Sequence, residues 1–297
     1  MTADTAVFIN DLVVKYGDTI ALDGLSLEIP NRGVFGLLGK NGAGKTTTIR
    51  AIIGLVKQES GTITVLDKYP CSSAFDRGNI SVLFAEDGLV SSLTSMENLT
   101  IWCGFHGLDK QMGKDHAKRI LKKMDIYHYR DTKVKELSTG NKRLLGLARA
   151  FMLPSEMVIL DEPTASLDPG RAEEVRRAIR ILAGTRLVLL STHNLTEAED
   201  LCDTVAIIDN GKLVISGRPG DLDKVTDKYA LRSETGKIVF RNETFESDKD
   251  GKIIMNCIDD PADMLRELID AGNRITYFRQ YRRNLSSIFI ELTKGDS

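Results

Sequence analysis

The stretch Gly39-Lys-Asn-Gly-Ala-Gly-Lys45-Thr46 decides the fold class of this chain. It fits the pattern G-x-x-x-x-G-K-[S/T], and it lies between a short apolar run that begins at Gly33 and a stretch, 46–54, whose apolar residues keep helical spacing. Glycines let backbone N–H groups close around phosphate oxygens, and the N-terminus of the following helix adds positive potential. The sequence therefore predicts a strand, a phosphate-binding loop and a helix that together bind a nucleoside triphosphate.

The loop supplies the first candidate ligands. The Lys45 ammonium can reach the terminal phosphates, and the Thr46 hydroxyl is a suitable ligand for Mg²⁺. The residues that we assign to nucleotide binding here are Asn41, Gly42, Gly44, Lys45, Thr46 and Thr47.

Two carboxylates follow a buried strand further along the chain. The apolar run Met157 to Leu160 ends at Asp161 and Glu162. Because the carboxyl ends of parallel strands meet at one edge of a sheet, we expect Asp161 beside the phosphate loop as a partner of Mg²⁺. Glu162 is expected one residue further out, where it can orient or deprotonate the attacking water. Helix-cap chemistry is the alternative explanation for such a pair.

Two more polar positions suit the same edge. The apolar run 187–190 leads to His193, and with the preceding amphipathic stretch 170–182 it predicts a βαβ unit of a parallel sheet. His193 then suits a sensor of the γ-phosphate, although a lone histidine is more often structural. Ser138 and Gly140 precede another helix, where a serine cap and free N–H groups form an anion site or an ordinary N-cap.

The remaining pattern predicts an α/β cassette followed by a small α+β domain. Strands are predicted at 7–14 and 20–29, and an Asn-Gly hairpin joins 205–208 to 212–215. Helices are predicted at 95–105, 112–124 and 141–152, within a helical subdomain of about 88–152. From residue 221 onward the predicted elements are strands at 236–240, 252–258 and 274–278 and helices at 262–271 and 285–292.

Composition excludes several classes of protein. Purely apolar runs are no longer than four residues, whereas a membrane span needs roughly 18 to 20. Forty basic against 42 acidic residues give a net charge of −2, which argues against a nucleic-acid partner. The four scattered cysteines and the absence of a signal-peptide profile indicate reduced thiols in a cytoplasmic protein.

Taken together, the motifs resemble the nucleotide-binding subunits of ATP-binding cassette (ABC) transporters over about residues 5–220. The loop 39–46 resembles the Walker A motif, and 157–162 resembles the Walker B strand with its glutamate. The signature motif, usually L-S-G-G-Q, corresponds to Leu137-Ser-Thr-Gly-Asn141, the D-loop to Ser166-Leu-Asp168, and the switch histidine to His193.

The resemblance implies a P-loop NTPase fold over residues 1–220, with a mixed sheet, N-terminal antiparallel strands and the helical subdomain, and an accessory domain at 221–297. It implies an ATPase that uses ATP and Mg²⁺, with Lys45, Glu162 and His193 in the catalytic site. Tyr16 would stack on adenine, and Ser138 and Gly140 would contact the ATP held by a second cassette, in a homodimer or a paired cassette. Thr139 and the tail 285–293 resemble the branch of antibiotic, peptide and sodium exporters.

The resemblance also implies a partner, a separate transmembrane permease that holds this chain at the inner face of the cell membrane, and no nucleic acid. Its expected docking surface is the segment 84–105, with Leu89, Val90, Leu93 and Trp102, unless these residues form the core of the helical subdomain.

One departure from the family pattern concerns Ala85, which stands where the family has a glutamine that contacts Mg²⁺ or the attacking water. We hypothesise that Glu86 takes over this metal contact, because a carboxylate can replace an amide oxygen on Mg²⁺. A catalytically impaired regulatory cassette is the alternative that Ala85 suggests. A soluble ABC ATPase that is not coupled to transport would need tandem cassettes or a long coiled-coil insertion, which 297 residues do not contain.

Overall fold

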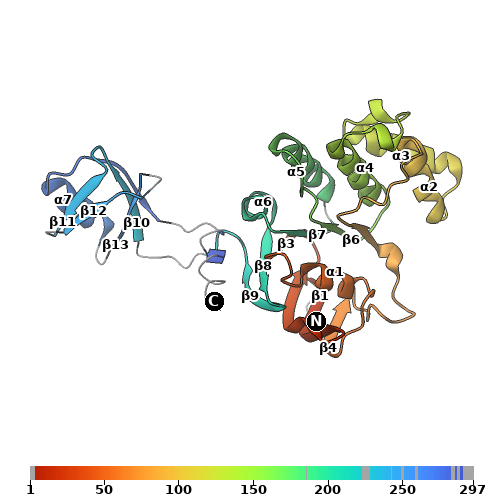
Figure 1. The fold of residues 1–297 in the computed structure, drawn as a ribbon, viewed down its shortest axis with the longest axis horizontal. Coiled ribbons are helices and arrows are strands. Elements are labelled where there is room, and N and C mark those ends of the chain that lie inside the picture. Colours follow the sequence, from red (N-terminus) through yellow and green to blue (C-terminus); the bar gives the residue numbers. More distant parts are fainter. Residues whose placement is uncertain are drawn as a thin grey trace. The chain divides into compact units, whose positions relative to one another are not determined.

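The computed structural model describes residues 4–184, 186–222, 228–241, 243–248, 251–257, 260–281, 285 and 288–289. The chain divides into two compact units, one ending at Gly220 and a second comprising Asp221–Glu291 (Figure 1). Each unit has its own cluster of buried apolar side chains.

A six-stranded sheet forms the centre of the first unit, in the order β5-β6-β7-β3-β8-β9. The strands are β3 (Gly33–Leu38), β5 (Ile80–Leu83), β6 (Met157–Asp161), β7 (Leu187–Thr192), β8 (Thr204–Asp209) and β9 (Lys212–Gly217). All neighbours are parallel except β9, which pairs antiparallel with β8. Every residue of β6 and β7 is buried, which explains why these strands read as unbroken apolar runs.

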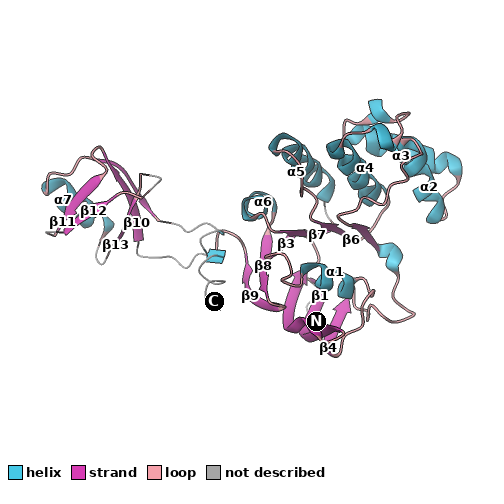
Figure 2. Cartoon of the chain, viewed as in Figure 1, coloured by secondary structure: helices cyan, strands magenta, loops and turns pink. Residues whose placement is uncertain are grey.

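Helices cover one face of this sheet, and α1 with a second sheet covers the other (Figure 2). The helices α5 (Pro169–Ala183) and α6 (Leu195–Leu201) lie on the first face. On the second face lie α1 (Lys45–Ile52) and a three-stranded antiparallel sheet of order β2-β1-β4. Its strands are β1 (Thr5–Tyr16), β2 (Thr19–Pro30) and β4 (Ser60–Val65). Apolar side chains of both sheets and of α1 form one core.

Three helices form the helical subdomain between β5 and β6. They are α2 (Ser95–Phe105), α3 (Lys110–Lys123) and α4 (Thr139–Met152). Each begins at a residue whose side chain caps it: Thr94 for α2, Asp109 for α3 and Ser138 for α4. Short 3₁₀ turns lie at Arg77–Asn79, Tyr127–Tyr129 and Val134–Glu136.

The second unit combines two small sheets with one helix. The strands β10 (Lys228–Ser233), β13 (Ile253–Asn256) and β14 (Ile275–Gln280) form a sheet of order β13-β10-β14. The strands β11 (Lys237–Phe240) and β12 (Glu243–Glu246) form a hairpin, and α7 (Pro261–Asp270) contributes buried Met264 and Leu268 to the local core.

The structure contains short elements that the sequence pattern did not predict: β4, β10, β12 and α6. The strand β12 reads Glu-Thr-Phe-Glu, so a single apolar residue gives no alternation to detect. The strands β12 and β13 follow one another in the chain but belong to different sheets. Most of the helix predicted at 285–292 lies outside the described residues. In the part of the chain that the structure describes, no helix has the length and apolar character needed to cross a bilayer.

Candidate active site

Three parallel strands bring the predicted site residues to one edge of the sheet. In the register of the sheet, Leu38 at the end of β3 lies opposite Thr192 of β7, and Asp161 at the end of β6 lies opposite Ser191. The loop after β3, the carboxylates after β6 and the histidine after β7 therefore meet at the carboxyl edge, as the sequence predicts.

The loop 39–44 turns sharply into α1. Gly44 is the N-cap of the helix and has φ of +107°, in the left-handed region that favours glycine. A Cβ at this position would lie 2.8 Å from Leu22 Cδ2 and 2.9 Å from the Ala21 carbonyl oxygen, so a larger residue does not fit. No side chain caps the helix, so the first-turn N–H groups of α1 are available to an anion.

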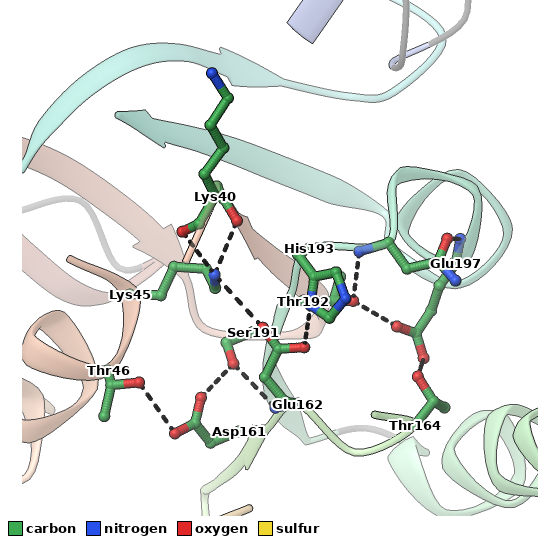
Figure 3. A network of polar contacts seen from close by, with 12 residues as sticks. Lys40, Lys45, Thr46, Asp161, Glu162, Thr164, Ser191, Thr192, His193 and Glu197 are labelled. Atoms are coloured by element: carbon green, nitrogen blue, oxygen red, sulfur yellow. Dashed lines mark hydrogen bonds and ion pairs between the residues drawn. The ribbon is translucent and has the colours of Figure 1, made fainter. Parts of the chain in front are cut away.

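Lys45 is buried, and its ammonium lies over the loop. Its Nζ donates to the carbonyl oxygens of Gly39 (2.8 Å) and Lys40 (3.2 Å). The same Nζ lies 3.4 Å from Glu162 Oε1 (Figure 3). The lysine thus joins the phosphate loop to the carboxylate that follows β6.

Asp161 is buried and fully engaged at the end of β6. One carboxylate oxygen, Oδ2, accepts from Thr46 Oγ1 at 3.3 Å, and the other accepts from the Ser191 hydroxyl. Ser191 therefore fixes Asp161 beside Thr46. Ser191 belongs to no motif, and its place at the end of an apolar strand is its signal in the sequence.

Glu162 stands between a lysine and a histidine. Its Oε1 faces Lys45, and its Oε2 lies 2.8 Å from His193 Nδ1 (Figure 3). Because an ionised carboxylate only accepts hydrogen bonds, Nδ1 carries the proton in this contact. Glu162 has φ of +50°, and its N–H donates to the carbonyl and hydroxyl oxygens of Ser191 at 3.1 and 3.0 Å. An unusual backbone conformation thus points the carboxylate at both partners.

A second carboxylate lies behind this group. Glu197 on α6 is buried and accepts from Thr164 Oγ1 and Thr192 Oγ1, both at 2.6 Å. It links the segment after Glu162 to the residue before His193. Sequence reasoning missed Glu197 because both of its partners are threonines, which carry no charge signal.

Other predicted residues lie apart from this cluster. Tyr16 is exposed at the end of β1. Ser138 accepts from Asn141 N–H at the start of α4, and Gly140 is buried in that helix. Among the described residues, no hydrogen bond or ion pair joins Tyr16, Ser138 or Gly140 to the loop 39–46. Around that loop, Asn41 and Gly42 are exposed and Thr47 is half-buried.

Glu86 is exposed and, within the described part of the chain, makes no hydrogen bond or ion pair to Thr46 or Asp161. The residue that engages its segment is Asp87, whose Oδ1 accepts from Arg143 at 2.8 Å. The metal contact expected of Glu86 stays a prediction.

The donor set fits Mg²⁺ on a nucleotide. A hydroxyl and a carboxylate 3.3 Å apart are hard oxygen ligands, and Mg²⁺ in phosphate sites takes one or two such ligands, with phosphates and water completing the shell. No group of three His, Cys, Asp or Glu side chains converges as a metal site among the residues described. Thr46 and Asp161 therefore suit an ion that arrives with phosphate.

Comparison with known proteins supports the same assignment. Residues 22–165 match the family model for ABC transporters. The chain is 31% identical over 292 residues to Nod factor export ATP-binding protein I of Burkholderia orbicola (strain AU 1054). The aligned region covers 94% of this chain and 94% of that protein. It is 32% identical over 303 residues to the protein of the same name from Rhizobium etli, covering 97% of this chain and 93% of that one.

Solved structures agree with the sequence relatives. The structure of cbiO1 from Clostridium perfringens, described as part of the ABC transporter complex cbiONQ, superposes with a TM-score of 0.67 at 26% identity and covers 74% of this chain and 90% of that one. An ATP-binding subunit of an ABC transporter superposes with a TM-score of 0.64 at 27% identity, covering 73% and 92%. The predicted fold class and family are confirmed. Such subunits work with transmembrane permease components. The chain belongs to the ABC transporter family, as an ATP-binding subunit and ATPase.

Proposed function

We propose that this chain is the ATP-hydrolysing subunit of an exporter and that Glu162 orients and deprotonates the attacking water. The observation that carries the proposal is the position of the Glu162 carboxylate, with Lys45 Nζ at 3.4 Å on one side and His193 Nδ1 at 2.8 Å on the other. A carboxylate held beside the lysine of the phosphate loop suits a base that orients the water for attack on a γ-phosphate.

The residues act mainly by positioning and by neutralising charge. The first-turn N–H groups of α1 and the Lys45 ammonium bind the phosphates, and the lysine offsets the charge on the γ-phosphate. Glu162 accepts a proton from water, and His193 holds the carboxylate through a hydrogen bond from Nδ1. Tyr16 is the proposed contact of the adenine ring.

Thr46 and Asp161 are the residues that would hold Mg²⁺ at this site. The ion, when bound, offsets negative charge on the β- and γ-phosphates. Ser191, by hydrogen bonding to Asp161, keeps one carboxylate oxygen directed at Thr46.

A second cassette completes the proposed site. Ser138 and Gly140 stand at the N-terminus of α4 and make no contact with the loop 39–46 of their own chain among the described residues. We assign them to the ATP held by a second copy or by a paired cassette, where free N–H groups of the helix terminus suit the γ-phosphate.

The proposed docking surface for the permease is an apolar patch on the helical subdomain. Val90 is 51% exposed, Ile101 45% and Phe105 79%, whereas Leu89, Leu93 and Trp102 are only partly exposed. Ile101 and Phe105 lie four residues apart on α2, so they share one helix face. Exposed large apolar side chains on one helix face, such as those of Ile101 and Phe105, are typical of an interaction site. The curated relatives are named as export proteins, and this supports an exporter that acts at the cytoplasmic face of the membrane.

The test is co-purification from detergent-solubilised membranes of the native host with the full tagged chain. The wild type should retain a protein with several membrane spans. Phe105→Glu should weaken binding of this partner by at least about 1.4 kcal/mol, or tenfold, because it places a charge where docking would bury an apolar side chain. Ile181→Glu, at an exposed position on α5, should retain the partner. Equal retention by both variants would remove Phe105 from the interface, and no membrane protein with the wild type would refute the coupling.

A further inference from the structure

Arg143 of α4 reaches the backbone at the end of β6. Its side chain is only 6% exposed. The Nε atom donates to the Pro163 carbonyl oxygen at 2.8 Å, and Nη2 donates to the carbonyl oxygens of Asp161 and Glu162, both at 2.9 Å. Three successive carbonyl groups at the end of β6 and directly after it are therefore hydrogen-bonded to one guanidinium.

The third nitrogen of the same guanidinium holds the segment after β5. Nη1 donates to the carbonyl oxygens of Phe84 (2.8 Å) and Ala85 (3.2 Å) and to Asp87 Oδ1 (2.8 Å). Each of the three nitrogens of the fork thus has an acceptor, and Asp87 supplies the countercharge. Ala85, which has no side-chain acceptor to offer, joins the network through its carbonyl group.

The helix α4 approaches this segment closely along its next turns. A Cβ on Gly146 would lie 2.9 Å from Leu83 Cδ1 and 3.2 Å from Asp87 Oδ1, so a larger residue there would displace these two side chains. Arg149 Nη1 donates to the Gly88 carbonyl oxygen at 2.6 Å. The segment 84–88 is therefore held against α4 at both ends.

The same contacts hold the backbone of Glu162 on both sides. Its N–H group is bound by Ser191 and its carbonyl group by Arg143, while the residue has φ of +50°. Fixing both peptide groups fixes the direction of the side chain, and hence the 3.4 Å separation between Oε1 and Lys45 Nζ. A planar fork is needed for this task, because a lysine ammonium is a point donor that cannot span these acceptors.

We propose that Arg143 is a positioning residue that sets the Glu162 carboxylate and, through Asp87, ties it to the segment 84–88 and to the helical subdomain. A shift of α4 then changes the geometry of Glu162, so the subdomain that carries the proposed permease surface controls the hydrolysis rate. This inference rests on the proposed role of Glu162. Ala85 has no side chain that could connect the segment 84–88 to the catalytic site. We assign this connection to the contacts that Arg143 makes with main-chain oxygens and with Asp87.

The first test is Arg143→Lys in the full chain, assayed for ATP hydrolysis. We expect kcat to fall by about 10- to 100-fold, because a small misplacement of a reacting group costs this much. The KM for ATP should change by less than about threefold, since the phosphate-binding residues lie on other elements. Arg176→Lys is the matched control: Arg176 is partly exposed and pairs with the exposed Glu173 on the same helix, α5. Such a surface pair contributes little, so the kcat of Arg176→Lys should match that of the wild type.

A second variant keeps the test decisive if Arg143→Lys does not fold. Asp87→Asn keeps an oxygen for Arg143 and removes the charge at a partly exposed site, and it should also lower kcat with KM unchanged. In the double variant Arg143→Lys/Asp87→Asn, the fold-reduction in kcat should be smaller than the product of the two single fold-reductions, because both changes break the same link.

Two outcomes would overturn the inference: kcat within about twofold of the wild type in both variants, or a loss of kcat matched by an equal loss of ATP binding. These outcomes are separate from failure of the proposed function. Wild-type ATP hydrolysis with an inactive Glu162→Gln variant keeps the proposed function even where Arg143 proves dispensable. Full activity of Glu162→Gln refutes both.

Discussion

At the scale of single residues, the site depends on contacts between side chains that are distant in the sequence. Glu162 is oriented by Ser191, 29 residues away, and by His193, 31 residues away. The carboxylate has two partners from different parts of the chain: Lys45, which belongs to the phosphate loop, and His193, which follows β7. The arrangement concentrates charge where we propose that a γ-phosphate is cleaved.

Lys45→Ala should weaken ATP binding by about 10- to 100-fold, because a hydrogen bond to a charged group contributes about 1.5–3 kcal/mol. Titration of the full chain with a fluorescent ATP analogue measures this loss. Lys57→Ala, which removes an exposed lysine beyond α1, is the control and should bind as the wild type does. Unchanged affinity in Lys45→Ala would show that the lysine does not contact the phosphates.

The sequence pattern predicted the residues that carry a motif and missed those that do not. Lys45, Thr46, Asp161, Glu162 and His193 meet at one edge, because strand order alone brings loop ends together. Arg143 follows the stretch 137–141, but its acceptors are main-chain oxygens of residues 84–85 and 161–163, and main-chain acceptors leave no trace in side-chain identity.

At the scale of elements, long amphipathic helices were predicted well and short elements were missed. The helix α4, predicted at 141–152, spans Thr139–Met152, since its apolar residues keep helical spacing and Ser138 caps its start. The Asn210-Gly211 turn also matches, with φ of +47° and +75° at the two residues. By contrast, α6 has seven residues and β12 four, too few for a period to show.

The capping box of α2 makes the stability of the helical subdomain depend on pH. Glu97 Oε2 accepts from Thr94 N–H at 2.8 Å, and Thr94 Oγ1 accepts from Glu97 N–H at 3.2 Å. The hydrogen bond from the Thr94 backbone holds the pKa of Glu97 below its usual value. The pKa of Glu97 is therefore lower in the folded state than in the unfolded state. The ionised carboxylate stabilises the fold at pH values above the unfolded-state pKa, and this stabilisation is lost as the pH falls through the lower, folded-state pKa.

Glu97→Ala should therefore lower the free energy of unfolding at neutral pH, and the difference from the wild type should shrink in acid. Urea unfolding across a series of pH values measures both. Thr94→Ala, which removes the other half of the box, should cost about 1 kcal/mol. A Glu97→Ala difference that does not change with pH would contradict this account of the carboxylate.

At the scale of the whole molecule, the chain combines a cassette with a second unit that has its own core. All the residues of the candidate site lie before Gly220, and the second unit begins at Asp221. The match to the Burkholderia orbicola relative covers 94% of this chain, so it includes most of the second unit. We propose that residues 221–297 form an accessory domain that contributes to dimerisation or regulation.

The catalytic role of Glu162 is tested by measuring Mg²⁺-dependent phosphate release by the full chain and by Glu162→Gln, with ATP binding measured in parallel. We expect hydrolysis by the wild type, a fall in kcat of at least about 100-fold in Glu162→Gln, and ATP binding that is retained in a closed dimer. Glu156→Gln, an exposed position at the opposite end of β6, should hydrolyse ATP normally. Wild-type turnover by Glu162→Gln would contradict the account, and ATP binding without turnover by the wild type would instead identify a regulatory cassette.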